Sequence, residues 1–307
     1  FRKKLPNPGL FRGTGDPQAA KLGGEAVSDD RFHMAGVMGW PVMHSRSPMM
    51  HNYWMAQTGL NGVYVPLAIK PGTVEAALRG LHPLRFSGVN VTIPHKLDAM
   101  RAVDELDPIA RKIGAVSCIH VRDDGSLYGT NNDWRGFLGN LRETCPDWQA
   151  HAGPAVVIGA GGGARAVCHG LLDAGATEIR LVNRTKAHAE AVASAIGGPI
   201  TCVDWSERAD ALDGAVLVVN TTSCGMVGQP GLDLSLDALP GDAIAADIVY
   251  APLQTPFLAA ASDRGNRTCA GLGMLLHQGP PAWKLWFGLE PEVTEDLRWM
   301  MADSLRS

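Results

Sequence analysis

VVIGAGGGARA, residues 156–166, decides the fold of this 307-residue chain. Its apolar start predicts a strand, its glycines a tight turn, and the alanine-rich run that continues to Gly175 a helix. In that context glycines let the backbone approach a pyrophosphate, which binds the free N–H groups of the first helical turn. The sequence therefore predicts a dinucleotide site. Its turn consists of Gly159, Ala160, Gly161, Gly162, Gly163 and Ala164.

The next apolar segment, 179–182, ends in Asn183, Arg184 and Thr185. An NAD site usually has Asp or Glu at this strand end, where the carboxylate binds the ribose 2′-hydroxyl. An arginine instead suits a 2′-phosphate, with which it forms charge-assisted hydrogen bonds. We therefore expect these three residues to contact the cofactor, and we expect that cofactor to be NADP.

Composition narrows the class of protein. A hydrophobic fraction of 46% and a formal net charge of −4 fit a globular, slightly acidic protein, and they give no sign of nucleic-acid or membrane binding. No run approaches the roughly 18 apolar residues that a membrane-spanning helix needs. The six cysteines are scattered, without metal-ligand spacing. They predict reduced thiols in the cytoplasm and no metal site. Monomer and homodimer are both compatible with the sequence.

Four regions follow from the pattern of elements. Residues 1–31 are rich in Gly, Pro and charge, and they predict a mobile extension without a signal peptide. Strands and helices alternate over 32–132, which we expect to form an α/β substrate-binding, catalytic domain. Short apolar strands with helices between them continue over 133–271, which predicts a Rossmann-like NADP-binding domain, a doubly wound parallel sheet. Residues 272–307 should form helices that pack back towards the substrate domain.

Individual elements can be assigned by residue range. Ser47 and Pro48 indicate a helix start, as a capping hydroxyl followed by proline. The sequence DDGS, 123–126, indicates a hairpin. Two helices, 272–287 and 292–305, are expected to close the chain. The predicted strands are 34–37, 63–69, 88–93, 118–122, 127–129, 155–158, 179–182, 200–203, 215–219, 243–248 and 267–269.

Two polar loops of the first half are candidates for substrate chemistry. The loop GWPVMHSRSP, 39–48, combines two hydroxyls, a cation and a helix N-terminus, which suits a carboxylate. A capped helix start with solvated serines is the alternative. The loop NVTIPHK, 90–96, ends a strand at Thr92 and places Lys96 at a helix start, where the macrodipole disfavours a lysine. That misplacement indicates a function, although a surface lysine is the commoner explanation.

Several motifs together resemble the shikimate dehydrogenase family. The resemblance covers residues 33–305 in the family's order. The motifs are HSRSP (44–48), GVNVTIPHK (88–96), IGAV (113–116), ND (132–133), NTTSCGM (220–226), DIVYAP (247–252), TP (255–256) and GLGMLLHQ (271–278).

The resemblance implies reversible hydride transfer between NADP and C3 of shikimate/3-dehydroshikimate, a step towards aromatic amino acids. It implies Lys96 as general acid/base paired with Asp133. The physics agrees, because hydride removal from an alcohol carbon requires the hydroxyl proton to leave, and an ammonium stabilises the alkoxide in the reverse direction. The implied substrate residues are Ser45, Ser47, Thr92, Ser117, Asp133, Tyr250 and Gln278. The further implied cofactor residues are Thr221, Thr222, Ser223, Met226, Ile248 and Gly271.

Two motifs depart from the family pattern. Where the family has Asn-Thr, this chain has Ser117 and Cys118, and Trp134 replaces the glycine after the aspartate. We expect both changes in the substrate pocket, where one lost polar contact costs about 1–3 kcal/mol; Asn132 is available to compensate. They leave open a relative acting on quinate or another hydroxylated ring carboxylate. A catalytically poor NADP-binding sensor is the other alternative, and the retained lysine–aspartate pair argues against it.

Overall fold

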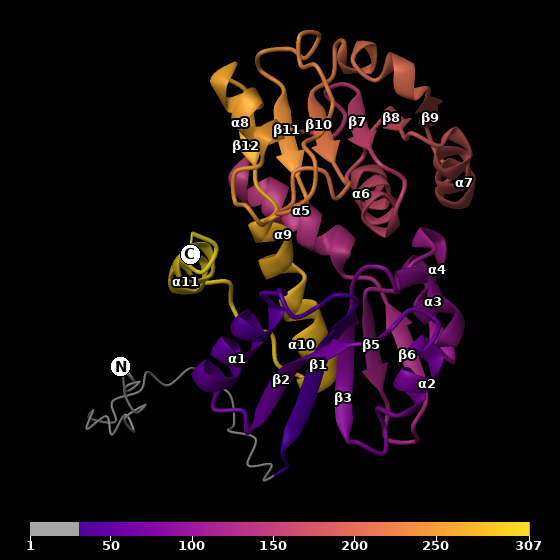
Figure 1. Cartoon of the computed structure of the whole chain (residues 1–307), viewed down its shortest axis with the longest axis vertical. Coiled ribbons are helices and arrows are strands. Elements are labelled where there is room, and N and C mark those ends of the chain that lie inside the picture. The colour runs from indigo at the N-terminus through magenta and orange to yellow at the C-terminus, as the bar shows by residue number, and fades with distance from the viewer. Residues whose placement is uncertain (1–30, 307) are drawn as a thin grey trace, which may run out of the picture. The chain divides into compact units, whose positions relative to one another are not determined.

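The computed structural model describes residues 31–306, in which two six-stranded sheets carry the helices (Figure 1). Apart from Arg31, the expected extension over 1–31 lies outside the described residues. Both sheets have helices packed against them, as expected for an α/β fold.

The second sheet has the order β12-β11-β10-β7-β8-β9, and all of its strands are parallel. The order reverses between β7 and β10, which confirms the predicted doubly wound sheet. Ligands of such sheets bind at the carboxyl ends of the strands beside this switch point. The strands are β7 (Ala155–Ile158), β8 (Ile179–Val182), β9 (Ile200–Val203), β10 (Leu217–Asn220), β11 (Ile244–Asp247) and β12 (Arg267–Cys269).

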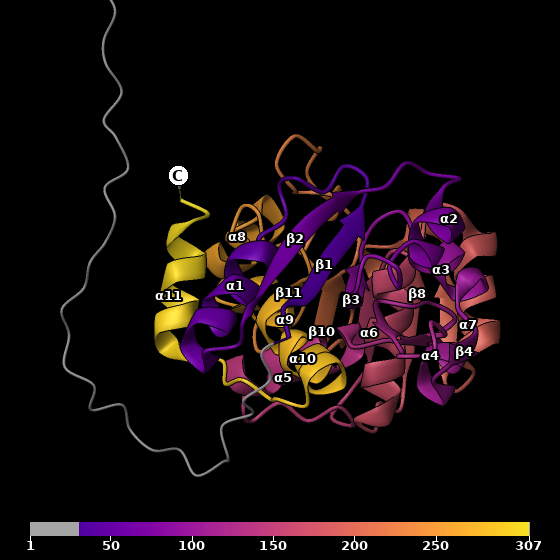
Figure 2. The same cartoon turned by 90° about the horizontal axis from the view of Figure 1, so that it is seen from below.

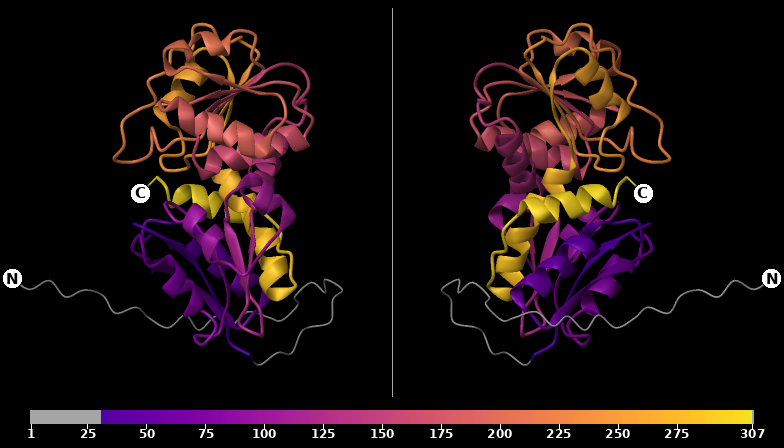
Figure 3. Two further views of the ribbon diagram at one scale, coloured as in Figure 1. Left: turned by 90° about the vertical axis from the view of Figure 1, so that its right-hand side faces the viewer. Right: turned by 90° about the vertical axis from the view of Figure 1, so that its left-hand side faces the viewer.

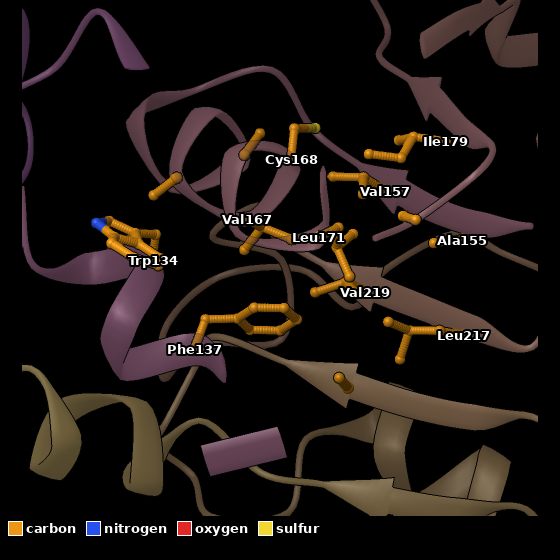
Figure 4. Close-up of a cluster of buried hydrophobic side chains, with 14 of the residues drawn as sticks. Trp134, Phe137, Ala155, Val157, Val167, Cys168, Leu171, Ile179, Leu217 and Val219 are labelled. Carbon is orange, nitrogen blue, oxygen red and sulfur yellow. The ribbon is translucent and has the colours of Figure 1, made fainter. Parts of the chain in front are cut away.

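Alternating residues of this sheet pack on opposite faces. Val157 and Val219 belong to a buried cluster with side chains of α5, α6 and α7, and Figure 4 shows them beside residues of α5 and α6. Val156 and Val218 pack instead against α8 and a short 3₁₀ turn, η2. Burial on both faces explains why these strands are continuous apolar runs in the sequence. The elements are α5 (Asp133–Thr144), α6 (Gly162–Asp173), α7 (Lys186–Ile196), η1 (Trp205–Glu207), η2 (Asp210–Leu212) and α8 (Pro256–Asp263).

The first sheet is mixed, with the order β2-β1-β3-β5-β6-β4. β1 pairs in parallel with β2 and β3, whereas β5 is antiparallel to β3 and β6, so the predicted hairpin is confirmed. The short strand β4 was not expected. The strands are β1 (His33–Gly39), β2 (Gly62–Ala68), β3 (Phe86–Val91), β4 (Glu105–Leu106), β5 (Cys118–Val121) and β6 (Leu127–Thr130).

The first sheet has a different helix group on each face. α2 (Val74–Arg79) and α3 (Lys96–Ala102) cover one face, and α1 (Ser47–Thr58) covers the other. The short α4 (Pro108–Ile113) precedes β5.

The expected cap of α1 is wrong in detail. Arg46 occupies the N-cap position, and the backbone N–H of Ser47 donates to Ser45 Oγ at 3.3 Å. Ser47 is therefore already helical, since the loop turns one residue earlier than expected.

The C-terminal region corrects the expected pair of helices. The segment 272–287 is two helices, α9 (Leu272–His277) and α10 (Gly279–Phe287), which meet at Gln278. Pro280 and Pro281 have no N–H group, so the hydrogen-bond ladder cannot continue through them. α11 (Glu295–Asp303) follows and lies beside α1 (Figure 2). The two side views show α9 between the sheets (Figure 3).

An aromatic cluster joins α1, β2 and α10. The ring of His51 stacks on Tyr64, with centroids 4.0 Å apart and planes 3° apart. His51 Nδ1 accepts a hydrogen bond of 2.7 Å from Trp283 Nε1. Burial lowers the pKa of His51 to about 3, because the charged imidazolium loses its hydration. His51 is therefore neutral in the folded chain at any ordinary pH.

This buried histidine predicts acid destabilisation. Above its unfolded pKa of 6.5, His51 is neutral in both states; below it, only the unfolded chain takes up the proton, down to about pH 3. The free energy of unfolding should thus fall by about 2 kcal/mol from this residue between pH 7.5 and pH 5. Urea unfolding of the wild type and His51→Gln measures the effect, since the amide accepts the Trp283 hydrogen bond without titrating. Equal pH dependence in both proteins would contradict the assignment.

Candidate active site

Lys96 and Asp133 meet in the site although 37 positions separate them. Lys96 is the first residue of α3, after β3, and Asp133 is the first residue of α5, after β6. The ammonium forms an ion pair with Asp133 Oδ2. The lysine side chain is 18% exposed and the aspartate only 3%. A buried carboxylate thus orients a lysine that remains accessible, which suits proton transfer to a bound molecule.

The backbone at Asp133 is fixed by a neighbour that the sequence did not single out. Asn131 Oδ1 accepts a hydrogen bond of 3.0 Å from the backbone N–H of Asp133. Asn131 Nδ2 donates to the carbonyl of Ala115 at 2.9 Å. This side chain ties the start of α5 to the loop before β5. Its only sequence signal was its place two residues before the aspartate.

The glycine turn packs against Lys96 and against the loops that follow β10 and β11. A Cβ on Gly162 would lie 3.1 Å from Lys96 Cδ, and one on Gly163 would lie 2.6 Å from Ile248 Cδ1. Ile248 and the lysine are therefore brought to the same turn by residues without side chains. The predicted cofactor and catalytic residues are neighbours in space.

At two further positions, only glycine lets neighbouring backbone segments approach as closely as they do. Gly159 has a φ of 112°, and a Cβ there would lie 2.7 Å from Thr221 Oγ1. A Cβ on Gly271 would lie 2.5 Å from the carbonyl oxygen of Val249. Any larger residue would separate the turn from the β10 loop, or α9 from the β11 loop.

The start of α6 suits an anion. Gly161 is exposed at the N-cap, and no side chain caps the first N–H groups of the helix. Free N–H groups and the positive end of the helix dipole favour a phosphate there. Ala160 is half-buried, whereas Ala164 is fully buried in the core, so only its backbone can face a ligand.

The end of β8 presents an unpaired cation. Arg184 and Thr185 are exposed, and Asn183 is half-buried with its Nδ2 donating to the carbonyl of Thr185 at 2.8 Å. Arg184 has no ion-pair partner among residues 31–306, whereas Lys186 pairs with Asp204 at 3.0 Å. Arg184 is therefore available to a phosphate.

A buried hydrogen-bond network holds the β10 and β11 loops together. Asp247 accepts hydrogen bonds from Thr255 Oγ1 at 2.7 Å and from Asn220 Nδ2 at 3.1 Å. Asn220 Oδ1 in turn accepts from Thr222 Oγ1 at 2.8 Å. Burial raises the pKa of Asp247 to about 6, while these hydrogen bonds oppose the rise. In the same loop, the carbonyl of Ser223 accepts from the Met226 backbone N–H at 3.2 Å.

In the loop of Ser45 and Ser47, the cation Arg46 does not join the two hydroxyls as expected. Arg46 donates to the carbonyl of Ser304, just after α11, at 2.8 Å. Its charge therefore contacts the carboxyl end of a helix, where a cation is favourable, and the predicted carboxylate cradle would consist of the two hydroxyls alone. Burial raises the pKa of Tyr250, and hydrogen bonds from the Arg46 backbone and the Ser45 side chain oppose that rise. The contact of Tyr250 with the substrate carboxylate stays a prediction.

Thr92 and Gln278, two further predicted substrate residues, are held by packing on different elements. Thr92 follows β3, and its methyl packs so closely on Gly39 that a Cβ there would lie 2.5 Å from it. Gln278 joins α9 to α10, and a Cβ on Gly136 of α5 would lie 3.0 Å from Gln278 Cβ. Gly136 is one turn after Asp133. Packing of α5 on α9 therefore sets the position of Gln278 relative to the aspartate.

Ser117 has a structural partner that its sequence position did not reveal. Its Oγ accepts a hydrogen bond of 2.9 Å from the backbone N–H of Asn132, and the residue is buried. The hydroxyl thus supports the start of α5. The side-chain nitrogen of Asn132 is buried and has no hydrogen-bond partner among the residues that the structure describes.

Trp134 is not a residue of the substrate pocket, contrary to expectation. Its ring lies in the core between α5 and α6, where it contacts His169 edge to face at 5.2 Å (Figure 4). A Cβ on Gly170 would lie 3.4 Å from the carbonyl of Trp134, so the absence of a side chain there makes room for it. The glycine-to-tryptophan departure therefore changes helix packing rather than the pocket.

No group of three or more His, Cys, Asp or Glu residues in the described part of the chain could hold a metal ion. None of the helices within residues 31–306 is long and apolar enough to cross a membrane.

Comparison with known families and relatives agrees with the site. Residues 37–119 match the model of the Shikimate dehydrogenase substrate binding domain, and residues 145–227 match Shikimate / quinate 5-dehydrogenase. The shikimate dehydrogenase (NADP(+)) of Paramagnetospirillum magneticum is 54% identical over 268 residues, covering 87% of this chain and 97% of the relative. That of Rhodospirillum rubrum is 54% identical over 272 residues, covering 87% and 96%.

Solved structures show the same fold. Shikimate 5-dehydrogenase from Thermus thermophilus, in complex with NADP(H) and shikimate, is 35% identical with a TM-score of 0.77, over 89% of this chain and 98% of that one. Quinate dehydrogenase from Corynebacterium glutamicum, in complex with NAD, is 28% identical with a TM-score of 0.81, over 90% and 100%.

Proposed function

The chain belongs to the shikimate dehydrogenase family, and we propose that it interconverts shikimate and 3-dehydroshikimate with NADP in aromatic amino-acid biosynthesis. One observation carries the proposal: the accessible Lys96, paired with Asp133, lies against Gly162 of the dinucleotide turn. A proton-transfer group thus lies where cofactor and substrate sites meet. The relatives at 54% identity are NADP-dependent shikimate dehydrogenases, which does not favour quinate or a sensor role.

The residues present fit NADP. The exposed Gly161 and the uncapped N–H groups of α6 suit a pyrophosphate, and Arg184, which has no ion-pair partner within the described part of the chain, suits a 2′-phosphate. Thr221 and Ile248 lie against the same turn and would border the rest of the cofactor. When bound, the cofactor supplies the hydride acceptor or donor. The acidic residue that NAD sites carry at the end of β8 is replaced by Asn183.

Lys96 accepts and donates the proton of the reacting hydroxyl. During oxidation its amine takes the proton from the reacting hydroxyl, and during reduction its ammonium donates the proton to the forming alkoxide. Asp133 stays beside it throughout, compensating the ammonium charge and limiting its rotamers. Because Asp133 is buried, its free oxygen can also accept a hydrogen bond from a ring hydroxyl without competition from bulk water.

The remaining polar residues orient the substrate. Ser45 and Ser47, with Tyr250, would hold the carboxylate at the start of α1, and Thr92 and Gln278 would bind ring hydroxyls. Ser117 contributes one hydroxyl that already accepts the Asn132 N–H, so its own proton remains available to a ligand.

We further propose that different regions of the chain bind the substrate and the cofactor. Residues 32–132 would bind the substrate and 133–271 the cofactor, with 272–307 packing back on the substrate domain. The contacts of α10 with β3 and β5 support that return. The cysteines are free thiols, which supports a reducing compartment, the cytoplasm. The chain would act there as a monomer or homodimer.

Lys96→Ala tests the mechanism. The purified wild type should reduce NADP+ with shikimate, and Lys96→Ala should lower turnover at least about 10²-fold, the usual share of a general acid/base. Steady-state kinetics of the wild type and of Lys96→Ala, with shikimate and with quinate as substrate, measure both turnovers. The affinity of Lys96→Ala for NADP should equal that of the wild type. Lys112→Ala, an exposed lysine of α4, is the control. A variant retaining more than about a third of wild-type turnover would refute the role of Lys96; faster turnover of quinate would move the substrate assignment.

Arg184→Ala tests the cofactor. Loss of its charge-assisted hydrogen bonds should raise the KM for NADP about tenfold or more, with little change for NAD. Lys186→Ala is the matched control, because Asp204 already pairs with that ammonium. An equal rise in KM for NADP and for NAD would show that Arg184 does not bind the 2′-phosphate.

Ser117→Asn tests the altered pocket. The amide oxygen can accept the Asn132 N–H, while the amide nitrogen adds a donor for a ring hydroxyl. The kcat/KM for shikimate should rise, at most about tenfold, since one hydrogen bond contributes about 1 kcal/mol. Ser117→Ala, which leaves that buried N–H unpaired, should lose stability and is the comparison. A fall in shikimate kcat/KM for Ser117→Asn would mean that the site is shaped around serine.

A further inference from the structure

Arg165 joins the helix after the glycine turn to the first half of the chain. It is the fourth residue of α6, and its Nη1 donates a hydrogen bond of 3.3 Å to the carbonyl oxygen of Ile113. Ile113 is the last residue of α4, so the guanidinium lies at the carboxyl end of a helix, where a cation is favourable. No step described so far uses this arginine.

A glycine makes room for this contact. Gly114 ends α4 with a φ of 74°, and a Cβ there would lie 2.9 Å from Arg165 Nη1. The arginine is half-buried, and burial lowers the pKa of Arg165 because the charged guanidinium loses hydration. It has no ion-pair partner among residues 31–306. A half-buried cation without a counter-ion is costly, so its place at α4 is not explained by charge pairing.

The segment that the guanidinium reaches is tied to the proposed proton-transfer pair. The backbone N–H of Val116 donates to the carbonyl of Lys96 at 3.1 Å. The carbonyl of Ala115 accepts a hydrogen bond of 2.9 Å from Asn131 Nδ2, the side chain that also fixes the start of α5. Ala115 and Val116 are fully buried, so these bonds are shielded from water. Residues 113–116 are therefore connected to Lys96 on one side and to the start of α5 on the other.

The lysine itself meets α6 through an apolar contact. Lys96 Cδ would lie 3.1 Å from a Cβ on Gly162. Such packing limits how closely the two can approach but fixes no direction, whereas the hydrogen bond of Arg165 depends on both distance and angle. The guanidinium is thus a directional link between the glycine turn and the backbone that carries the lysine.

We propose that Arg165 is a positioning residue, which holds residues 113–116, and with them the proton-transfer pair, in register with the helix proposed to bind the cofactor. This role rests on the proposed function. Hydride and proton leave the carbon and the oxygen of one alcohol group, so the cofactor and Lys96 must be aligned in one complex, and a displacement of about 1 Å costs about 10²-fold in rate. Arg165 lies on neither the serine loop nor the end of β8. Its loss should therefore slow the chemical step and leave the binding of each ligand nearly unchanged.

Arg165→Met tests this, because methionine keeps an unbranched apolar stem and removes every donor. In a single turnover with enzyme and NADP+ in excess over shikimate, stopped-flow detection of NADPH measures the chemical step in folded, ligated enzyme alone. The rate constant should fall about ten- to a hundredfold, while the Kd for NADP and the KM for shikimate stay within about twofold. Arg165→Lys, which keeps a donor for the Ile113 carbonyl, should recover most of the rate. Arg165→Gln, too short to reach that carbonyl, should match Arg165→Met and serves where methionine impairs folding.

Arg264→Met is the matched control. Arg264 Nη2 also donates to a backbone carbonyl, that of Leu239 at 3.0 Å. Leu239 precedes β11, so this bond lies away from the carboxyl ends of the strands, where the cofactor is expected. The single-turnover rate constant of Arg264→Met should equal that of the wild type.

Three results would overturn the inference. An unchanged rate constant in Arg165→Met would show that the link to Ile113 does not set the alignment, even if stability falls. A higher Kd for NADP at an unchanged rate constant would show that Arg165 contacts the cofactor instead. A lysine variant as slow as the methionine variant would show that the donated hydrogen bond is not responsible. The two hypotheses are separable, because a wild type that does not oxidise shikimate refutes the proposed function, whereas an active wild type with an unaffected Arg165→Met refutes only this inference.

Discussion

The buried carboxylate of Asp133 is the constraint on which the site depends. An isolated carboxylate with 3% exposure is costly, and Lys96 compensates it. The pair can form only if the starts of α3 and α5 are adjacent. Strand order achieves this, since β3 and β6 both flank β5, and each leads into one of the two helices. The mixed first sheet is therefore a requirement of the chemistry.

The second constraint is close helix packing around α5. A Cβ on Gly136 would lie 2.5 Å from the carbonyl of Met274, and one on Gly273 would overlap the amide of Asn140. Small residues thus let α5 and α9 approach, as the views of the two helices show (Figure 1). Because α5 begins at Asp133 and α9 ends beside Gln278, this packing fixes the proposed substrate residue Gln278 relative to the proposed catalytic pair.

Sequence patterns predicted the elements better than the directions of side chains. The strands of the second sheet were assigned nearly residue for residue, since burial on both faces makes them continuous apolar runs. The break at Gln278 was missed because apolar periodicity continues through the two prolines. Trp134 was placed in the pocket from its neighbour in sequence, but the first turn of α5 points it at α6. Arg46 was likewise grouped with the hydroxyls, whereas its partner, Ser304, lies 258 positions away.

The observed side-chain directions show which departures from the family pattern bear on packing and which bear on the substrate site. Trp134 adds buried contacts at the α5–α6 interface, so it bears on stability and leaves the pocket untouched. Only Ser117 alters the polar lining. Its oxygen accepts the Asn132 N–H and its proton remains free, so the position keeps one donor where an amide would offer two. In the proposed site, the ring-hydroxyl side would lose one contact, while the carboxylate cradle and the proton-transfer pair would be complete. That asymmetry favours weaker binding of the same substrate over a change of reaction.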